Sequence, residues 1–540
     1  MKSGNVLLFC LSLALVGNAL AFSRGEAASS LPVPAGQEVF PAYGAIASPV
    51  INADPSLAMP VGLGSAASGG STIDVQVGTA SFSGPVDIYF GYFAPSLDPQ
   101  NIYTLTSSDA FVPLSVADPL HENPIPWIAN TSAGVNASLA SSLGSISVSS
   151  LPAGTYIAYL LVTPAGSIAR YYLWTTTLAV ANNVLPITVN GSFCSAHSYP
   201  NKPCVSVTVC SPGTSDCQTI DDILLDTGSV GLRIFRQVLT VSLPQKTIGT
   251  NSLAECIQFG DGSSEWGPVS RASVILGNEP AVEVPVHVLD STFGSLPGPC
   301  LNADPSPSAA GYNGILGVGL FIQDCGPACA SIVRNGMYYS CSGSGCTGTA
   351  VGLADQVQNP VAHLPQDNNG VIILLPAVPP GGLPDVNGSL VLGIGTQSNN
   401  SPSGVTAYAT DEFGEFTTTF DGVLFSSFID SGSNGLFFSA PSESLLPECR
   451  PPLAAWFCPP STIALSAVNT GAEGSPSGAV SFLIGNLMNL AGSSNSVFSE
   501  IGGNSAGDFD WGLPFYFGKN VVVGIEGGGS FLGTGPYWAY

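Results

Sequence analysis

The chain has 540 residues, enough for roughly two to four domains that each bury a core. Only 9% of the residues are charged, while 64 glycines and 44 prolines favour a turn-rich β protein over a helical one. The formal net charge of −25 and the sequence pI near 4.1 argue against nucleic acid and anionic membranes as partners.

Residues 1–21 have the pattern of a secretory signal peptide. Lys2 precedes an apolar core, and Ala19-Leu20-Ala21 forms an A-x-A cleavage site. No later apolar run is long enough to cross a bilayer. We therefore expect an exported protein without a membrane span, located in the periplasm, on the cell surface or in the medium. Residues 22–55 are rich in Ala, Pro, Ser and Gly and are expected to form a flexible lead-in.

Residues 56–182 contain no cysteine and several short segments in which apolar and polar residues alternate. The expected strands cover residues 73–77, 86–90, 102–105, 157–162 and 171–174. Strands at this spacing, separated by Pro and Gly turns, predict a small β-sandwich of immunoglobulin-like type. Its aromatic residues are expected in the core rather than on a ligand-binding surface.

Twelve of the thirteen cysteines lie between Cys194 and Cys458, and the remaining one, Cys10, lies in the signal segment. An even number of cysteines in an exported chain predicts up to six disulfides. The short-range candidates are Cys210–Cys217, Cys325–Cys329, Cys341–Cys346 and Cys449–Cys458. A metal site in the 325–346 cluster is the alternative, but no histidine lies nearby, so no metal or cofactor is predicted.

The segment Asp226-Thr227-Gly228-Ser229 is echoed by Asp430-Ser431-Gly432-Ser433, which begins 430 − 226 = 204 residues later. Each copy follows an apolar run, a pattern that predicts a buried strand ending in a tight turn. A repeat with so long a separation indicates a duplicated lobe rather than a solenoid. Asp221 and Asp222, which precede the first copy, are expected in a solvated turn.

Two such turns that meet across a two-fold axis would bring two carboxyl groups together. Like charges this close do not both ionise, so one proton is held between Asp226 and Asp430 at acidic to neutral pH. The ionised group can take a proton from a water molecule, and the protonated group can donate to a substrate carbonyl oxygen. The glycine two residues after each acid would permit a sharp turn. The hydroxyls of Thr227 and Ser431 could bond across to the opposite loop.

The D-T-G-S and D-S-G-S pair resembles the two active-site loops of pepsin-like aspartic proteases. Residues 257–277 look like that family's flap hairpin, with Phe259-Gly260-Asp261-Gly262 at its tip. Residues 313–317 resemble the strand beside the first aspartate, with residues 511–515 as the counterpart, and residues 387–395 resemble a segment near the start of the second lobe. Phe259 departs from the family, which has a tyrosine there, so the ring could cover a substrate but the hydroxyl is missing.

The resemblance implies a bilobal pepsin-like double-ψ β-barrel unit at residues 183–540. With the immunoglobulin-like β-sandwich predicted at residues 56–182, the chain is expected to be all-β. Lobe one would cover about 183–380 and lobe two about 381–540. The implied activity is hydrolysis of internal peptide bonds in a peptide or protein substrate. Asp226 and Asp430 would be the catalytic pair, surrounded by the loops Thr227-Gly228-Ser229 and Ser431-Gly432-Ser433.

The arrangement also resembles an uncharacterised family of exported bacterial proteins that carries the duplicated motif without an assigned activity. A second hypothesis is therefore a binding protein that keeps the pepsin scaffold without catalysis, which the missing flap tyrosine and the attached N-terminal region favour. The intact pair of motifs favours an enzyme, because burying two carboxylates together is costly unless they have a purpose. A third hypothesis is a structural surface protein. The sequence leaves the oligomeric state open.

Overall fold

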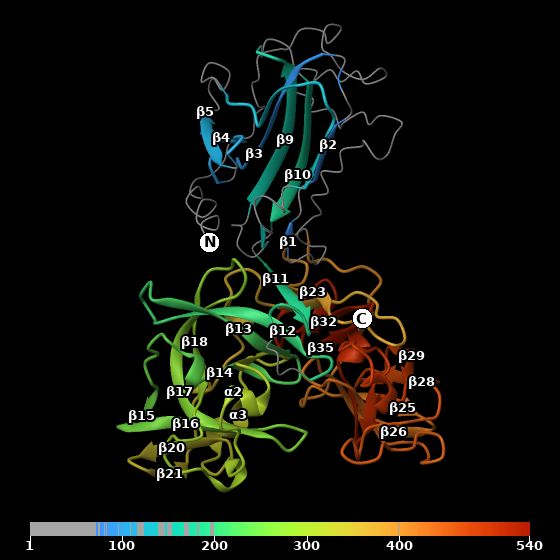
Figure 1. Ribbon diagram of the computed structural model, residues 1–540. Coiled ribbons are helices and arrows are strands. Elements are labelled where there is room, and N and C mark those ends of the chain that lie inside the picture. Colours follow the sequence, from blue (N-terminus) through green and yellow to red (C-terminus); the bar gives the residue numbers. More distant parts are fainter. Residues whose placement is uncertain are drawn as a thin grey trace. The chain divides into compact units, whose positions relative to one another are not determined.

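In the computed structural model, the chain divides into two compact units, residues Met1–Asn182 and Asn183–Tyr540 (Figure 1). In the first unit the structure describes residues 72–73, 76–79, 82, 84–95, 97–108, 110–115, 124–138, 146–147, 154–166 and 172–180. In the second it describes residues 183–194, 199–397 and 399–540. The predicted signal peptide and lead-in lie outside the described residues. Among the described residues, no helix is both long and apolar enough to span a membrane.

The described part of the first unit consists of strands. They are β1 (Thr72–Ile73), β2 (Gln76–Thr79), β3 (Val86–Phe93), β4 (Asn101–Leu105), β5 (Phe111–Ser115), β6 (Ile128–Thr131), β7 (Val135–Ser138), β8 (Ile146–Ser147), β9 (Gly154–Pro164) and β10 (Tyr172–Val180). One sheet has the order β10-β9-β3-β4-β5, with β6 paired to β3, while β2 pairs with β7 and β1 with β8. The immunoglobulin-like sandwich stays a prediction.

Aromatic side chains fill the interior around β3. Tyr89 and Phe90 are buried, and so is Tyr159 on the neighbouring strand β9. Tyr92 stacks on Tyr103 of β4, with ring centroids 5.2 Å apart, and meets the edge of Phe111 of β5 at the same distance. Aromatic pairs in these geometries add to the stability gained from burial alone. These residues therefore belong to the packing of the sheet.

The second unit is also built from strands, joined by short helical turns. The strands are β11 (Val184–Val189), β12 (Pro203–Cys210), β13 (Cys217–Asp226), β14 (Val230–Phe235), β15 (Thr247–Ile248), β16 (Asn251–Gln258), β17 (Ser264–Ile275), β18 (Val282–Leu289), β19 (Gly314–Val318), β20 (Tyr338–Ser342), β21 (Gly345–Gly348), β22 (Gly370–Leu374), β23 (Val386–Leu392), β24 (Ala407–Ala409), β25 (Phe416–Phe420), β26 (Val423–Ile429), β27 (Leu436–Phe438), β28 (Ile463–Thr470), β29 (Ser477–Ile484), β30 (Gly502–Asn504), β31 (Asp508–Trp511), β32 (Asn520–Gly524), β33 (Gly529–Ser530), β34 (Gly533–Thr534) and β35 (Tyr537–Ala539). The helical turns are η4 (Arg236–Val238), η5 (Gly298–Cys300), α2 (Pro307–Ala310), α3 (Pro327–Ser331), η6 (Leu353–Asp355), η7 (Pro360–His363), α4 (Leu487–Leu490) and η8 (Leu513–Tyr516).

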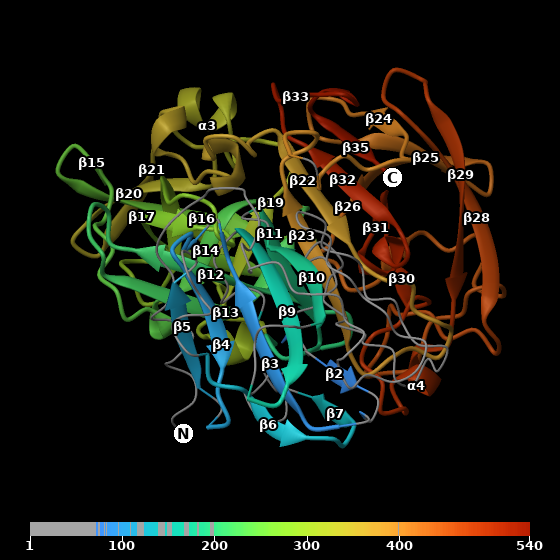
Figure 2. The same cartoon turned by 90° about the horizontal axis from the view of Figure 1, so that it is seen from above.

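Two large sheets organise the second unit. A 16-stranded sheet has the order β21-β20-β16-β17-β18-β14-β19-β13-β12-β11-β23-β22-β32-β35-β24, with β15 paired to β16. A 7-stranded sheet has the order β29-β28-β25-β26-β31-β27-β30. Figure 2 shows β13, β14 and β19 in green and β26 and β31 in orange to red. The chain is thus all-β, with barrel and half-barrel sheets, as the sequence predicts.

The same four-strand arrangement occurs twice. In the first sheet, β19 lies between β13, to which it is parallel, and β14, to which it is antiparallel, and β14 is parallel to β18. In the second sheet, β31 lies between the parallel β26 and the antiparallel β27, and β27 is parallel to β30. In both cases the strand before the motif and the strand after it pair with one later strand. The duplication seen in the sequence is therefore also a duplication of topology.

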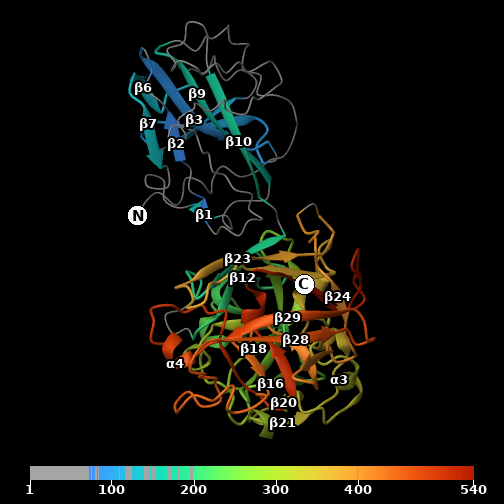
Figure 3. The ribbon, with the colours of Figure 1, turned by 90° about the vertical axis from the view of Figure 1, so that its right-hand side faces the viewer.

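The main apolar cluster of the second unit draws on both sheets, and smaller clusters lie around it. In the 7-stranded sheet, whose β28–β29 hairpin faces the viewer in Figure 3, aromatic rings fill the interior. Phe438 stacks on Phe509 at 4.8 Å, and Phe509 stacks on Trp511 at 4.4 Å. Burying each such side chain stabilises the fold by about 1.5–3 kcal/mol. The motif loops therefore emerge from a rigid base.

Six disulfides link the twelve cysteines of the second unit. The four predicted pairs are confirmed: Cys210–Cys217, Cys325–Cys329, Cys341–Cys346 and Cys449–Cys458. The remaining pairs are Cys194–Cys204 and Cys256–Cys300. A metal ion needs thiolates, and the cysteines of the 325–346 cluster are bonded to each other instead. That cluster is therefore not a metal site.

Candidate active site

Asp226 and Asp430 sit at equivalent places in the two motif loops. Asp226 is the last residue of β13, and Asp430 follows the last residue of β26. In each loop the backbone N–H two residues on donates to the acid's Oδ1 at 2.8 Å, from Gly228 and Gly432 respectively. The serine three residues on donates to Oδ2, at 2.8 Å for Ser433. Each carboxyl group is thus fixed by its own loop.

The two loops are joined by reciprocal hydrogen bonds. Thr227 N donates to Ser431 Oγ at 3.1 Å, and Ser431 N donates to Thr227 Oγ1 at 3.0 Å. Each hydroxyl also donates to the residue before the aspartate of the opposite motif, Thr227 to Ile429 O at 2.9 Å and Ser431 to Leu225 O at 2.7 Å. Both residues are buried, so these bonds act in a medium of low dielectric. The hydroxyls of Thr227 and Ser431 thus bond across to the opposite loop, as predicted.

The two carboxyl groups approach closely because the residues facing them lack side chains. Gly228 N lies 3.2 Å from Asp430 Oδ1, so the N–H group can interact with both acids. A Cβ atom at Gly228 would lie 2.7 Å from Asp430 Cγ, and one at Gly432 would lie 2.7 Å from Asp226 Oδ1. Neither glycine has a positive φ. Glycine is required here for close approach rather than for a left-handed turn.

The environment favours one shared proton. Burial raises the pKa of Asp226 well above its ordinary value, and the neighbouring Asp430 raises it further through its charge and a side-chain hydrogen bond. Bonds from Ser229 and Gly228 oppose the rise without cancelling it. Solvent reaches the pair, since Gly228 is exposed and Asp430 only partly buried. The arrangement therefore offers one carboxyl that accepts a proton and one that donates it.

The predicted flap residues form the turn of the β16–β17 hairpin. Phe259 N donates to Ser263 O at 3.0 Å, and Gly262 N, at φ +87°, donates to Phe259 O at 3.0 Å. Asp261 Oδ1 accepts from the N–H and the hydroxyl of Ser263, at 2.8 and 2.6 Å. The turn, including Gly260, is exposed apart from the half-buried Phe259, which packs on an apolar cluster beside β19.

Residues 179–540 match the family described as "Protein of unknown function (DUF3443)". The chain belongs to this family. The match covers the second unit, and it confirms the expectation of an uncharacterised family. No curated protein matches the sequence.

In this DUF3443 chain, a short strap at residues 199–202 is fixed beside the second motif loop. Asn201 Nδ2 donates to Asn434 O at 2.9 Å and to Phe498 O at 2.8 Å, and Phe498 N donates back to Asn201 Oδ1 at 2.7 Å. Asn434 Nδ2 donates to Pro200 O at 3.2 Å. Asn434 lies four residues after the second acid, so the strap is attached to the site itself.

Tyr199 of the strap lies within electrostatic range of the acid pair. Burial raises the pKa of its phenol, and the charges of Asp226, Asp222 and Asp430 raise it further. The hydroxyl is therefore protonated near the pair at any ordinary pH. No motif marks Tyr199 in the sequence; its position depends on the folding of a segment before β12.

The expectation that Asp222 lies in a solvated turn is wrong. Asp222 is 4% exposed and forms an ion pair with the fully buried Lys202 at 2.5 Å, rather than standing in a solvated turn. Its φ of +60° turns the chain so that only the neighbouring Asp221 is exposed. The sequence did not predict this ion pair because Lys202, just before β12, is twenty residues from Asp222 in β13.

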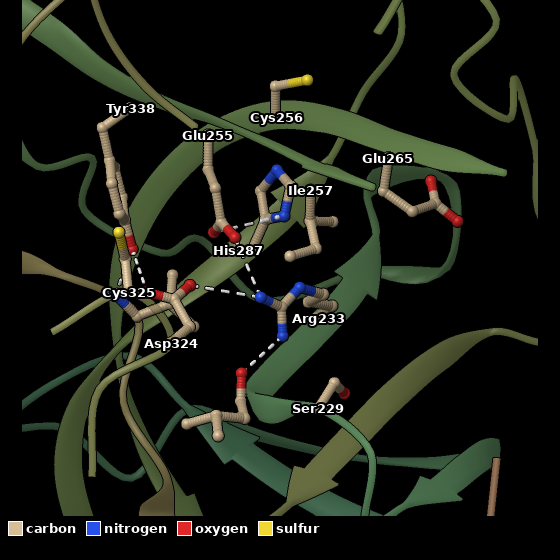
Figure 4. Close-up of polar contacts among 12 residues, drawn as sticks. Ser229, Arg233, Glu255, Cys256, Ile257, Glu265, His287, Asp324, Cys325 and Tyr338 are labelled. Atoms are coloured by element: carbon tan, nitrogen blue, oxygen red, sulfur yellow. Dashed lines mark hydrogen bonds and ion pairs between the residues drawn. The ribbon is translucent and has the colours of Figure 1, made fainter. Parts of the chain in front are cut away.

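Behind the first loop lies a buried charge network (Figure 4). Arg233 of β14 bonds Glu255 at 2.9 Å and Asp324 at 3.2 Å, and its Nη1 donates to Val230 O at 2.6 Å. Burial raises the pKa of Asp324, and Glu255 raises it further. Burial is the largest single effect and tends to raise the pKa of Glu255, but the charges of Arg233 and His287 and the hydrogen bonds to the carboxyl together lower that pKa. The network thus fixes the chain just after the first motif.

A third acid, Asp510 of β31, also faces the pair. Burial raises its pKa well above the ordinary value, and the charges of Asp430 and Asp226 raise it further. The Ser433 hydroxyl lies between the Asp430 and Asp510 carboxyls. Asp510 directly precedes residues 511–515, the segment identified as the counterpart of residues 313–317. Aligning the two segments could have drawn attention to an acid at this position.

Proposed function

We propose that residues 183–540 form a bilobal pepsin-like aspartic endopeptidase that hydrolyses internal peptide bonds in extended substrates. The observation that carries this proposal is the pair of reciprocally bonded loops, which hold Asp226 and Asp430 so close that Gly228 N approaches both. Such an approach of two acids is costly and is expected where the pair shares a working proton.

The chemistry follows from the shared proton. The ionised carboxyl takes a proton from a water molecule as the water oxygen attacks the substrate carbonyl carbon, and the protonated carboxyl donates to the carbonyl oxygen. The tetrahedral intermediate collapses when a proton passes to the amide nitrogen, so that the C–N bond breaks and a carboxylic acid and an amine leave. Thr227 and Ser431 hold the loops in register, and Phe259 covers the substrate from the hairpin.

The repeated topology supports a two-lobed, double-ψ arrangement, since each motif strand and the strand after it flank one later strand. We assign the first unit to an immunoglobulin-like sandwich on its strand spacing. Export is supported by the disulfides, which persist in oxidising compartments. The substrate is then a peptide or protein met outside the cytoplasm.

The second candidate is a binding protein with the same scaffold. It is favoured by Phe259, whose ring has no hydroxyl to bond across a substrate. Tyr199 weakens this objection, because it supplies a protonated phenol close to the same pair from a different segment. The solvent-exposed Gly228 also speaks against a purely structural role, in which the pair would be sealed.

The test is cleavage of a quenched, unfolded protein substrate from acidic to neutral pH. Asp226→Asn and Asp430→Asn are compared with wild type, each with and without a statine-type inhibitor. Asp216→Asn, which changes an exposed carboxylate, is the matched control. We expect each dyad variant to lose at least about 100-fold in kcat while remaining folded, since general acid–base catalysis contributes that much or more.

Cleavage that both substitutions and the inhibitor remove, and that Asp216→Asn retains, supports the peptidase. Absence of cleavage by a folded, disulfide-bonded wild type refutes it and favours the binding protein. Cleavage that survives in Asp226→Asn refutes the dyad.

A further inference from the structure

The two halves of the second unit provide an internal comparison, and it singles out Asp510. In the first sheet Leu224 pairs with Ile315, two residues before the partner of Asp226. The equivalent pair in the second sheet is Phe428 with Asp510. Ile315 is 1% exposed and packs in an apolar cluster. A carboxyl group thus stands in the second half where the first half has an apolar side chain.

The Asp510 carboxyl is only partly satisfied by its surroundings. Its Oδ1 is buried and has no hydrogen-bond partner among the described residues. The groups that act on it are the Ser433 hydroxyl and the acids Asp430, Asp226 and Asp508. Its backbone is held on both sides, by β26 and by β27, so the side chain cannot easily turn away.

A buried carboxyl oxygen without a hydrogen-bond partner, beside two other acids, destabilises the fold. Its retention at a working site is explained if a ligand supplies the missing partner. The groups that best complement a carboxylate among like charges are the ammonium of lysine, with three donors, and the forked guanidinium of arginine. The net charge of −25 also draws cationic peptides toward this surface.

We propose that Asp510 is a specificity-determining residue that binds a lysine or arginine side chain next to the scissile bond. This inference rests on the proposed peptidase function and names its substrate class. The basic side chain binds the ionised carboxylate, and the proton that Asp510 held is released to solvent. The bond then bridges substrate and β31 at the edge of the acid pair, with Ser433 between Asp510 and Asp430.

The experiment uses the full chain and pairs of quenched peptides that differ only in lysine or norleucine at the residue before or after the scissile bond. Wild type, Asp510→Asn, Asp510→Ile and Asp508→Asn are compared by kcat/KM. Asp508→Asn is the matched control, since it removes an exposed charge two residues away on the same strand. Thermal melting confirms that each variant folds.

We expect wild type to prefer a lysine peptide over its norleucine partner by about 10-fold to 100-fold, the effect of a hydrogen bond to a charged group. Asp510→Asn and Asp510→Ile should reduce that ratio to near one. Asp508→Asn should keep the preference.

A wild type that cleaves both peptides of each pair equally overturns the proposal, even if no Asp510 variant folds. An Asp510→Asn protein that loses activity equally on both peptides also overturns it, because the residue then acts on structure or on the dyad. Failure of the underlying function is recognised separately: wild type then cleaves no peptide, or cleaves it as well as Asp226→Asn does.

Discussion

Glu265 is expected to make the fold less stable as pH rises. It lies on β17 beside the hairpin turn and is 1% exposed. The Tyr312 hydroxyl donates to its Oε1 at 3.2 Å, while its Oε2 has no hydrogen-bond partner among the described residues. Burial raises the pKa of Glu265 from 4.5 to about 8, and the charge of Asp304 adds to the rise. The folded protein therefore holds a proton that the unfolded chain has released.

The sign follows from proton binding. Between pH 4.5 and about 8 the folded state binds more protons at this site than the unfolded state, so stability falls as pH rises through the window. The gap between the two pKa values corresponds to an upper limit of about 5 kcal/mol. Glu265→Gln keeps an acceptor for Tyr312 and does not titrate. The variant should exceed wild type by a few kcal/mol above pH 8 and match it within about 1 kcal/mol near pH 4.

The measurement is urea unfolding at a series of pH values, followed by tryptophan fluorescence, which reports on the fully buried Trp266 next to Glu265. Glu412→Gln, at an exposed glutamate, is the control and should track wild type. The reasoning is refuted if wild type and Glu265→Gln lose stability in parallel from pH 4.5 to 8. Parallel curves would mean that the carboxyl finds a partner or water in the folded state.

Three further changes test the elements around the site. Ser431→Ala leaves the buried Thr227 N–H and Leu225 carbonyl without partners, and it should lower the free energy of unfolding by about 2–4 kcal/mol in urea titrations. Arg233→Leu removes the guanidinium that pairs with the buried Glu255 and Asp324 and should cost at least about 3 kcal/mol, seen as a lower Tm; an unchanged Tm would show that the network is hydrated. Removing the Cys256–Cys300 bond, which spans 44 residues, should cost about 4 kcal/mol by the chain-entropy relation, checked by unfolding with both cysteines replaced by alanine.

Features that depend on neighbours in sequence were predictable. The apolar runs before Asp226 and Asp430 become β13 and β26, because an apolar run that ends in small residues has few other conformations open to it. The four predicted disulfides close short loops, whose ends are close whatever the rest of the chain does. The hairpin turn at Phe259 was readable for the same reason.

Features that depend on distant segments were not predictable. Lys202, which precedes β12, pairs with Asp222 of β13, and the strap that carries Tyr199 is held where Asn201 is bonded to Asn434 and Phe498. No local sequence pattern predicts these contacts, because the two partners are far apart in sequence and meet only in the folded protein. The Cys256–Cys300 bond is of the same kind, because its closing segment folds back across the hairpin.

The repeat also explains why acid conditions suit both stability and the proposed chemistry. Where the two halves agree, as at Thr227 and Ser431, each loop donates a backbone hydrogen bond to the hydroxyl of the other. Where they differ, as at Ile315 and Asp510, one half has gained a buried acid. Asp510, Asp226 and Glu265 all have pKa values raised first by burial, so all three favour a folded state that retains protons. When pH falls, these groups become protonated in the unfolded chain as well, so unfolding no longer releases their protons. The fall also weakens the charge repulsion in a chain with 36 acidic and 11 basic residues. These three groups therefore contribute most to stability in the pH range in which a single proton on the Asp226–Asp430 pair is kept.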